Sequence, residues 1–402
     1  MLWKVDLVKG ENQTAFVEHL GAALRVRMPS YTASAHFSDD GAFVTSVKGL
    51  FAFGEEQQEI SWEMNKSSDG TLVSVRVSDA NGKEVPRLLK YELNGFFTNV
   101  LTEALSNKRK EFFHHSTYYY VGPQLDGEYW LKGFRLAPAF PNDPDLYLIN
   151  AERPVALDYY VNAVDAHMAV AISEARAKRF IARLSLISNI GFYKSGGEQR
   201  WVLIPQPEGG FISQRYQLGY AAQNISHFAM PSKGELSRLG DYSSSIKDWG
   251  LRAGKLLSLP HETRRILQWI EDAKNNLSEA FDNAARMYQA ALVIGGIYPS
   301  ISLAYKVAAV EALSLGDTRY GSFGTFMEGN LETKDYDKKF IDALYGIARS
   351  AHFHSGRFPV DDALDQLYNP FWTEHGLVSA DLSWTGHRIL RLAMINWLVM
   401  LL

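Results

Sequence analysis

The stretch that decides the fold of the C-terminal third is Leu344–Gly356, which reads LYGIARSAHFHSG. It closes a longer segment, 336–352, in which apolar residues recur at helical spacing and form one face that can be buried. The end of that segment carries Arg349, His352 and His354. Arginine is a permanent cation that can hold a phosphate through two N–H groups, and histidine exchanges protons near neutral pH. The segment therefore predicts a helix whose polar end can bind and act on a phosphate.

The sequence around this segment is also helical in pattern. Pro260 fits the first turn of a helix, where its missing N–H group costs nothing. Short polar or glycine-containing connections, such as Gly316-Asp317 and 321–324, separate the apolar runs. Helices are expected over about 260–274, 276–294, 299–315, 336–352 and 384–401. Five helices at this spacing predict an all-α bundle.

The first half of the chain has a different pattern. Alternating runs at 3–8 and 72–77 predict an antiparallel sheet over residues 1–95, with Asn81-Gly82 in a tight hairpin turn. A short helix is expected over 96–110 and one long helix over about 165–189. Further strands are expected at 116–121, 154–164, 200–204 and 211–220. The predicted fold class is therefore α+β, a β-rich N-terminal region with one long helix followed by an all-α bundle.

The length of 402 residues predicts two or three domains. A β-rich domain, interpreted as a sensing or scaffold domain, is expected over 1–230, with a division into two subdomains near residue 95. Residues 231–258 are rich in Ser, Gly and Lys and are expected to connect it to a helical domain over 259–402.

The composition excludes several classes of function. The chain has 46% hydrophobic and 21% charged residues, which is typical of a soluble globular protein, and a net charge of −4. An RNA substrate would therefore need a local basic patch. Without cysteine there are no disulfides, thiolate nucleophiles or Cys-ligated metals. No apolar run reaches membrane-spanning length and the start lacks a signal peptide, so a cytoplasmic location without membrane contact is expected. Motifs for nucleotide hydrolysis, dinucleotide binding and zinc proteolysis are not found in the sequence.

The segment Leu344–Gly356 resembles the end of an Apea-like HEPN domain. That family shows a tyrosine, a short apolar step and then Arg-Ser-x-x-x-His, often followed by Gly. Arg349, Ser350 and His354 fill the three motif positions with four residues between Arg and His. This sequence departs from the family pattern at Ser355, which separates His354 from the glycine.

A second likeness lies upstream, at residues 304–313. This segment resembles the central helix of the family, in which a Glu follows small and apolar residues and precedes Leu; here the Glu is Glu311. The resemblance covers about 276–402 and identifies the helical domain as HEPN-like.

The resemblance implies a homodimer, formed through the helical domain, whose two motifs face one shared cleft and cleave RNA without a metal or cofactor. In that scheme His354 moves a proton to or from the 2′-hydroxyl or the leaving oxygen, and Arg349 holds the scissile phosphate. The product would be a 2′,3′-cyclic phosphate, and DNA would not be cut. The family further implies a place in prokaryotic phage defence or a toxin-like system.

Several interpretations compete with this one at the segment itself. On a regular helix, five residues turn about 500°, so Arg349 and His354 would lie roughly 140° apart. A helix end, a distorted helix or a second subunit would each resolve this, and His352 is a rival acid or base. Arg349 could form only a structural ion pair, either with Glu311 or with Asp342. In the catalytic interpretation, Glu311 instead orients Arg349. The rival function is a HEPN dimer that binds RNA or a partner without cutting; a third is a metal-dependent hydrolase using His352 and His354.

Weaker RNA-binding predictions concern two groups of cations. Lys108, Arg109 and Lys110 lie near His114-His115 and three tyrosines, and Arg176, Arg179 and Arg183 form one stripe of the long helix. The competing interpretation is solvated strand edges and a solvated helix rim. Two further side chains have ordinary interpretations: Lys306 as a surface charge and Tyr345 as part of helix packing.

Overall fold

A computed structural model describes most of the chain, and two compact units are distinguished within it. Unit 1 comprises Met1–Phe112 and Val161–Ser173, and unit 2 comprises Phe113–Tyr160 and Glu174–Leu402. The described residues are 1–4, 11–37, 43–67, 71–131, 133–139, 152–194, 199–205, 211–217, 240–247, 256–272, 276–295, 298–356 and 374–402.

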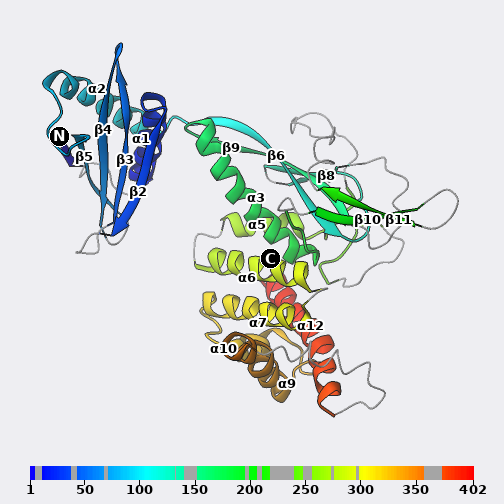
Figure 1. Cartoon of the computed structure of the whole chain (residues 1–402). Coiled ribbons are helices and arrows are strands. Elements are labelled where there is room, and N and C mark those ends of the chain that lie inside the picture. The colour runs from blue at the N-terminus through cyan, green and yellow to red at the C-terminus, as the bar shows by residue number, and fades with distance from the viewer. Residues whose placement is uncertain are drawn as a thin grey trace. The chain divides into compact units, whose positions relative to one another are not determined.

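Unit 1 is an antiparallel sheet with two helices (Figure 1). The strand order is β1-β5-β4-β3-β2, and every neighbouring pair is antiparallel. The elements are β1 (Leu2–Lys4), α1 (Glu11–Arg27), β2 (Tyr31–Phe37), β3 (Phe43–Phe53), β4 (Glu56–Lys66), β5 (Leu72–Asp79) and α2 (Arg87–Leu105).

The core of unit 1 lies between the sheet and the two helices. Trp62 and Phe51 from the sheet are buried with Phe16 of α1 and Leu93 of α2. The apolar residues of α2 recur every three or four positions, so that one face of the helix is buried. Aromatic stacking extends the core, since the rings of Trp3 and Phe97 lie 4.5 Å apart.

Three expectations for unit 1 are wrong. The helix expected over 96–110 is α2, which begins at Arg87 and ends at Leu105. Residues 11–27, expected within a region of strands, form helix α1. The turn at Asn81-Gly82 is present, with Gly82 at a φ of +78°, but it joins β5 to α2 and forms no hairpin. The carboxylate of Asp79 explains this difference, because it accepts hydrogen bonds from the backbone N–H groups of Asn81 and Lys83 and turns the chain toward the helix.

Unit 2 begins with a second sheet, and a hairpin of two strands follows the long helix. The sheet has the order β6-β9-β8-β7, and the hairpin pairs β10 with β11. The elements are β6 (Lys110–Val121), β7 (Tyr129–Leu131), β8 (Phe134–Pro138), β9 (Glu152–Ala163), α3 (Ala166–Ser188), β10 (Gln199–Pro205) and β11 (Phe211–Gln217). β6, β9 and α3 each have residues in both units.

The rest of unit 2 is helical, and α7 lies in the middle of these helices (Figure 1). It packs against α6, α8, α12 and the segment Leu344–Ser350. The elements are α5 (Thr263–Asp272), α6 (Asn276–Ile294), α7 (Pro299–Gly316), α8 (Phe323–Asn330), α9 (Lys338–Ala343), the π-helix η1 (Leu344–Ser350), α10 (Ala351–Ser355) and α12 (Glu374–Met400). The buried core includes Phe281, Val307, Phe326 and Trp397.

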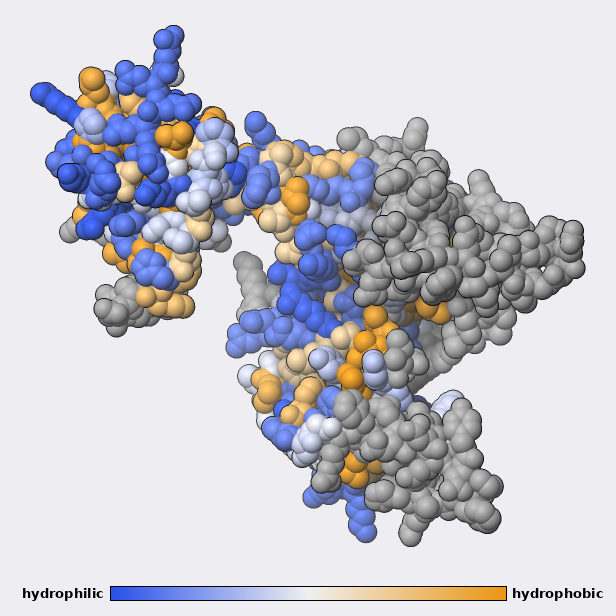
Figure 2. Space-filling model, viewed as in Figure 1, coloured by the Kyte–Doolittle hydropathy of each residue, from blue (hydrophilic) through white to orange (hydrophobic). Residues whose placement is uncertain are grey.

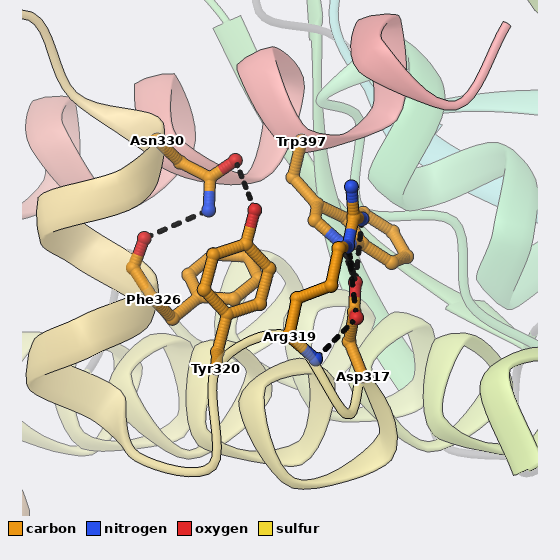
Figure 3. A network of polar contacts seen from close by, with 6 residues as sticks. All are labelled: Asp317, Arg319, Tyr320, Phe326, Asn330 and Trp397. Atoms are coloured by element: carbon orange, nitrogen blue, oxygen red, sulfur yellow. Dashed lines mark hydrogen bonds and ion pairs between the residues drawn. The ribbon is translucent and has the colours of Figure 1, made fainter.

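A polar network fixes the turn after α7 against α12 (Figure 3). The buried carboxylate of Asp317 accepts hydrogen bonds from the guanidinium of Arg319 and from Nε1 of Trp397, the latter at 2.9 Å. Burial alone would raise the pKa of Asp317, but these donors hold that pKa below its ordinary value. Tyr320 extends the network to Asn330 on α8. The network therefore ties three segments of the bundle together next to its apolar core.

The coarse fold expected from the sequence is confirmed: the protein is mixed α and β, with the sheets in its N-terminal half and the helices mostly in its C-terminal half. Some details differ. Residues 321–324 were expected to be a connection, but Phe323 and Gly324 begin α8. The chain divides at about residue 112, and most of the expected connection 231–258 lies outside the described residues. The second sheet and the helical bundle therefore belong to one unit.

None of the helices that the structure describes is long and apolar enough to cross a membrane.

Candidate functional site

The segment that carries Arg349 and His354 is a distorted helix. Residues 344–350 form a π-helix, which is flanked by α9 and α10. Its hydrogen bonds close over five residues instead of four, so the helix is wider than an α-helix up to Ser350, and the regular α10 follows directly. A distorted helix was one of the three alternatives that the sequence left open for this segment.

Local sequence explains where this segment begins, how it packs and where it ends. The carboxylate of Asp337 caps α9 by accepting hydrogen bonds from the N–H groups of Lys339 and Phe340. Leu344 and Ala348 are buried against the bundle. Gly386 of α12 lets that helix approach closely, because a side chain there would meet Leu344. At the other end Gly356 has a φ of +63°, which terminates α10.

Arg349 is positioned by Glu311 of α7. Its Nε and Nη2 atoms lie 3.1 and 3.0 Å from Oε2 of Glu311. The hydroxyl of Tyr345 donates a hydrogen bond of 2.9 Å to the other carboxylate oxygen, and the Tyr345 ring lies 5.4 Å from the guanidinium carbon. The side chain of Arg349 remains 25% exposed, which is enough for contact with a ligand. Glu311 thus fixes the orientation of a cation that is still accessible.

His354 completes the group at the surface. Its Nε2 atom lies 3.3 Å from Nη1 of Arg349. A guanidinium can only donate, so a hydrogen bond at this contact uses a lone pair of the ring nitrogen. An imidazole on an exposed side chain is suited to exchange a proton with a bound substrate.

Tyr345 contributes more than the predicted helix packing. Its hydrogen bond to Glu311 raises the pKa of the phenol, and burial and the Glu311 charge act in the same direction. Tyr345 therefore stays protonated and keeps donating to the carboxylate. Its ring packs 5.2 Å from that of Phe323, so it joins the ion pair to the bundle.

The supporting residues Ser350 and His352 lie beside this group. Both are half-buried, and the ring of His352 is edge-on to that of Phe353 at 5.2 Å. His354 is the imidazole that contacts Arg349. Within the described residues, no group of three or more His, Asp or Glu side chains is arranged to hold a metal ion. A cation at Nε2 of His354 would also be repelled by the guanidinium next to it.

No family model, curated protein or solved structure matches this chain. The likeness to Apea-like HEPN domains therefore rests on the residues named above.

The weaker RNA-binding candidates are partly engaged in ion pairs. Arg109 contacts Glu18 at 2.6 Å, while Lys108 and Lys110 are exposed. In α3, Arg183 is 8% exposed and bound to Asp282 at 2.6 Å, and the more exposed Arg179 lies 3.4 Å from the same carboxylate. Arg176 donates to the carbonyl of Tyr160 and lies over the ring of Phe134, and burial lowers its pKa. Each of the bonded arginines would have to exchange a protein partner for phosphate.

The expectation that Lys306 is a surface charge is wrong. Lys306 is 8% exposed, and burial, followed by repulsion from Arg391, lowers its pKa to about 8. His387 lies nearby on α12, where burial and the Lys306 charge lower its pKa to about 3. Both Lys306 and Arg391 lie over the ring of Tyr288, at 5.3 and 5.6 Å. The sequence could not show this burial, because α6 and α12 cover the face of α7 that carries Lys306.

Unit 1 has a groove of about 340 Å³ that the sequence analysis did not anticipate. It lies between α1 and α2, with Phe51 and Phe96 among its apolar residues and Glu92 and Glu103 among its charged ones. Apolar side chains interrupt the otherwise hydrophilic surface of this unit (Figure 2). A helical pattern in residues 11–27 would have been the signal, since α1 forms one wall.

Proposed function

We propose that the protein is a metal-independent endoribonuclease of the HEPN type, acting as a homodimer through its helical bundle. One observation carries the proposal: Nη1 of Arg349 lies 3.3 Å from the exposed His354 imidazole, although the two residues would face different sides of a regular helix. The pair combines a fixed cation and a proton acceptor, which are two of the groups used in cleavage through a 2′-hydroxyl.

In the proposed reaction, Arg349 turns its Nη1 donor from Nε2 of His354 to the substrate phosphate, and the lone pair freed on Nε2 takes the proton of the substrate 2′-hydroxyl. The 2′-oxygen then bonds to phosphorus while the bond from phosphorus to O5′ breaks, which leaves a 2′,3′-cyclic phosphate and a 5′-hydroxyl. Arg349 donates to the phosphate oxygens on which negative charge accumulates. Acid–base assistance supplies roughly 10²–10⁴-fold, and loss of an oriented donor to a developing oxyanion costs about 10²–10³-fold.

The leaving O5′ also needs a proton. In this scheme His354 begins with no proton on Nε2, because that nitrogen acts as the base. The same nitrogen therefore cannot donate a proton to O5′ in the same step. His354 of a second copy, facing the same phosphate, would meet this requirement. This is the chemical reason for including a dimer in the proposal.

The decisive experiment incubates wild type, Arg349→Ala and His354→Ala with total RNA in the presence of EDTA. We expect cleavage by the wild type to survive the chelator and to fall at least 10²-fold in either variant. Lys339→Ala removes an exposed cation from the start of the same segment and should leave cleavage unchanged. Mapping of the products should give cyclic phosphate ends, and a DNA of the same sequence should stay intact. Full activity of either alanine variant would refute the proposal.

One observation favours the second candidate, a bundle that binds RNA or a partner without cutting it. Glu311 makes two contacts with Arg349, as it would in a purely structural ion pair. In that case the same experiment should show no cleavage. RNA should then bind with equal affinity to the wild type and to His354→Ala.

The cellular setting forms part of the proposal. An RNA-cleaving bundle joined to a separate N-terminal unit suits a phage-defence or toxin-like system in the cytoplasm, in which unit 1 recognises a trigger. Growth arrest on expression of the wild type, relieved by His354→Ala, would support this setting. Equal growth of the two strains, with cleavage in vitro intact, would limit the proposal to the reaction itself.

A further inference from the structure

A partly exposed phenylalanine, Phe353, follows Arg349 by about one helical turn and directly precedes His354. Phe353 is 46% exposed, although it directly precedes His354 in α10. Full burial of a phenylalanine side chain contributes about 1.5–3 kcal/mol to folding, and Phe353 forgoes much of this contribution. Ile347, on the other side of Arg349 in the sequence, is 38% exposed. Two partly exposed apolar residues thus lie in the segment that carries the charged pair.

The ring of Phe353 packs against a second aromatic ring, that of Tyr305. The Tyr305 ring of α7 lies 5.8 Å from it at an interplanar angle of 54°, and the ring of His352 meets it nearly edge-on at 5.2 Å. These two contacts fix the orientation of the ring in the structure and leave part of its surface to solvent. A rigid exposed ring costs little conformational entropy when it binds a flat ligand.

We propose that Phe353 is a stacking platform for an unpaired nucleobase beside the scissile phosphate, so that the site takes single-stranded RNA. This inference rests on the proposed ribonuclease function and adds the substrate class. A base has a π-face for the ring, and its phosphate has oxygens for Arg349, so one nucleotide satisfies both neighbouring surfaces. A base paired in a duplex has both of its faces covered by its neighbours and could not stack on Phe353.

A second protein chain is the other possible occupant of this apolar surface. Packing another copy directly on Phe353 would also cover Arg349 and His354, and taking a charged group out of water without a new partner is costly. A nucleotide brings its own anion to the cation. The observations therefore favour RNA at the ring, with any subunit contact lying outside it.

The test is a thermodynamic cycle on non-cleavable RNA. The probes are a 2′-O-methyl oligoribonucleotide and a series in which one base at a time is removed, bound to the full-length wild type, Phe353→Leu and Phe353→Trp. Base stacking contributes about 1–3 kcal/mol per base, which corresponds to a roughly 5- to 150-fold change in affinity. We expect loss of one particular base to weaken wild-type binding by about tenfold or more, and to have little further effect in Phe353→Leu.

The leucine variant keeps an apolar side chain, while the tryptophan variant keeps a stacking ring and should retain the sensitivity to that base. Phe37, which is 75% exposed in unit 1, offers a matched control, because Phe37→Leu should behave as wild type. Adding a complementary strand should abolish binding at the ring.

Two outcomes would overturn the inference. Equal sensitivity to every missing base in wild type and Phe353→Leu would show that no base stacks there. A fall in the dimer fraction of Phe353→Leu by sedimentation velocity, with no such base effect, would assign the ring to a subunit contact. Both results leave the proposed roles of Arg349 and His354 in cleavage by the wild type standing. Conversely, a wild type that stacks the base but cuts no RNA would refute the proposed catalysis alone.

Discussion

Arg349 and Arg391 lie in the same bundle and have opposite environments. Arg391 of α12 is 2% exposed, and its guanidinium donates to the carbonyls of Leu186 and Ile187 at the C-terminal end of α3. Arg349 is bound to a side chain, Glu311, and is partly exposed. Arg391 completes the backbone hydrogen bonding at the end of a helix. Arg349 is held by Glu311, and its Nη1 atom faces the exposed imidazole of His354.

The difference shows that the acceptors of an arginine say more about its role than its position on a helix. The last carbonyls of α3 have no partners within the helix, and a cation there is also favoured by the helix dipole. Asn189, with a φ of +58°, ends α3 and receives a hydrogen bond from the hydroxyl of Tyr288. Arg391 is therefore part of the fold, and Arg349 is available for chemistry.

The largest effect on stability is expected for Arg391→Met. It leaves two buried carbonyls without their donor, at about 1–3 kcal/mol each, partly offset because a buried charge is removed. We expect the bundle to lose about 2–4 kcal/mol, measured by hydrogen exchange of the α3 and α12 amides in unit 2. Arg349→Met should cost less, because the ion pair is partly exposed and Tyr345 still donates to Glu311 when the guanidinium is lost. A similar loss in both variants would remove the distinction between the two arginines.

The second effect has the opposite sign. At neutral pH Lys306 is charged, yet it is buried beside His387 and Arg391 of α12 and over Tyr288 of α6. A pKa lowered from 10.5 to about 8 corresponds to roughly 3 kcal/mol of destabilisation below pH 8. Lys306→Met should therefore stabilise the bundle at pH 7, by about 1–3 kcal/mol once the lost contact with Tyr288 is counted.

The pH dependence of this gain follows from the direction of the shift. Between pH 8 and 10.5 the unfolded chain binds more protons at Lys306 than the folded one, so wild-type stability rises with pH and the advantage of Lys306→Met shrinks. Exchange rates of the α7 amides at pH 7 and pH 10 measure the change. Lys178→Met, at a side chain that is 65% exposed, should show neither effect. A variant no more stable than wild type at pH 7 would mean that Lys306 is not desolvated.

The sequence predicted regular helices well and their distortions poorly. The helix expected over 276–294 is α6, whose apolar residues recur at helical spacing. The helix expected over 299–315 differs from α7 by one residue, and Pro299 in its first turn marks its start. α8 was missed because Gly324 and Gly329 suggest a loop, although Ser322 caps its start. α1 was missed because strand-like runs surround it.

The candidate site was predictable in its residues and not in its geometry. Motif spacing pointed to Arg349 and His354. For Glu311 the sequence left two roles open: it could orient Arg349 for catalysis, or it could form only a structural ion pair. The π-helix at 344–350 was not predicted, because its apolar spacing does not differ from that of a regular helix. Phe353 was not singled out, since an apolar residue in a helix is ordinarily buried. Its exposure is a property of the packed bundle.

The smallest expected effect is that of Arg179→Ala, and it sharpens the comparison within one helix. Arg179 and Arg183 share the carboxylate of Asp282, but the side chain of Arg179 is 53% exposed and that of Arg183 only 9%. Loss of Arg179 should change stability by less than about 0.5 kcal/mol, whereas loss of Arg183 leaves a mostly buried carboxylate with a weaker partner and should cost more.

The Arg179→Ala variant also tests the predicted RNA contact. A lost phosphate contact lowers the slope of log affinity against log salt concentration for RNA binding by about 1. An unchanged slope would mean that Arg179, like Arg183, serves α6 and the fold, and would leave Arg349 as the arginine for which phosphate binding is proposed on the strongest grounds.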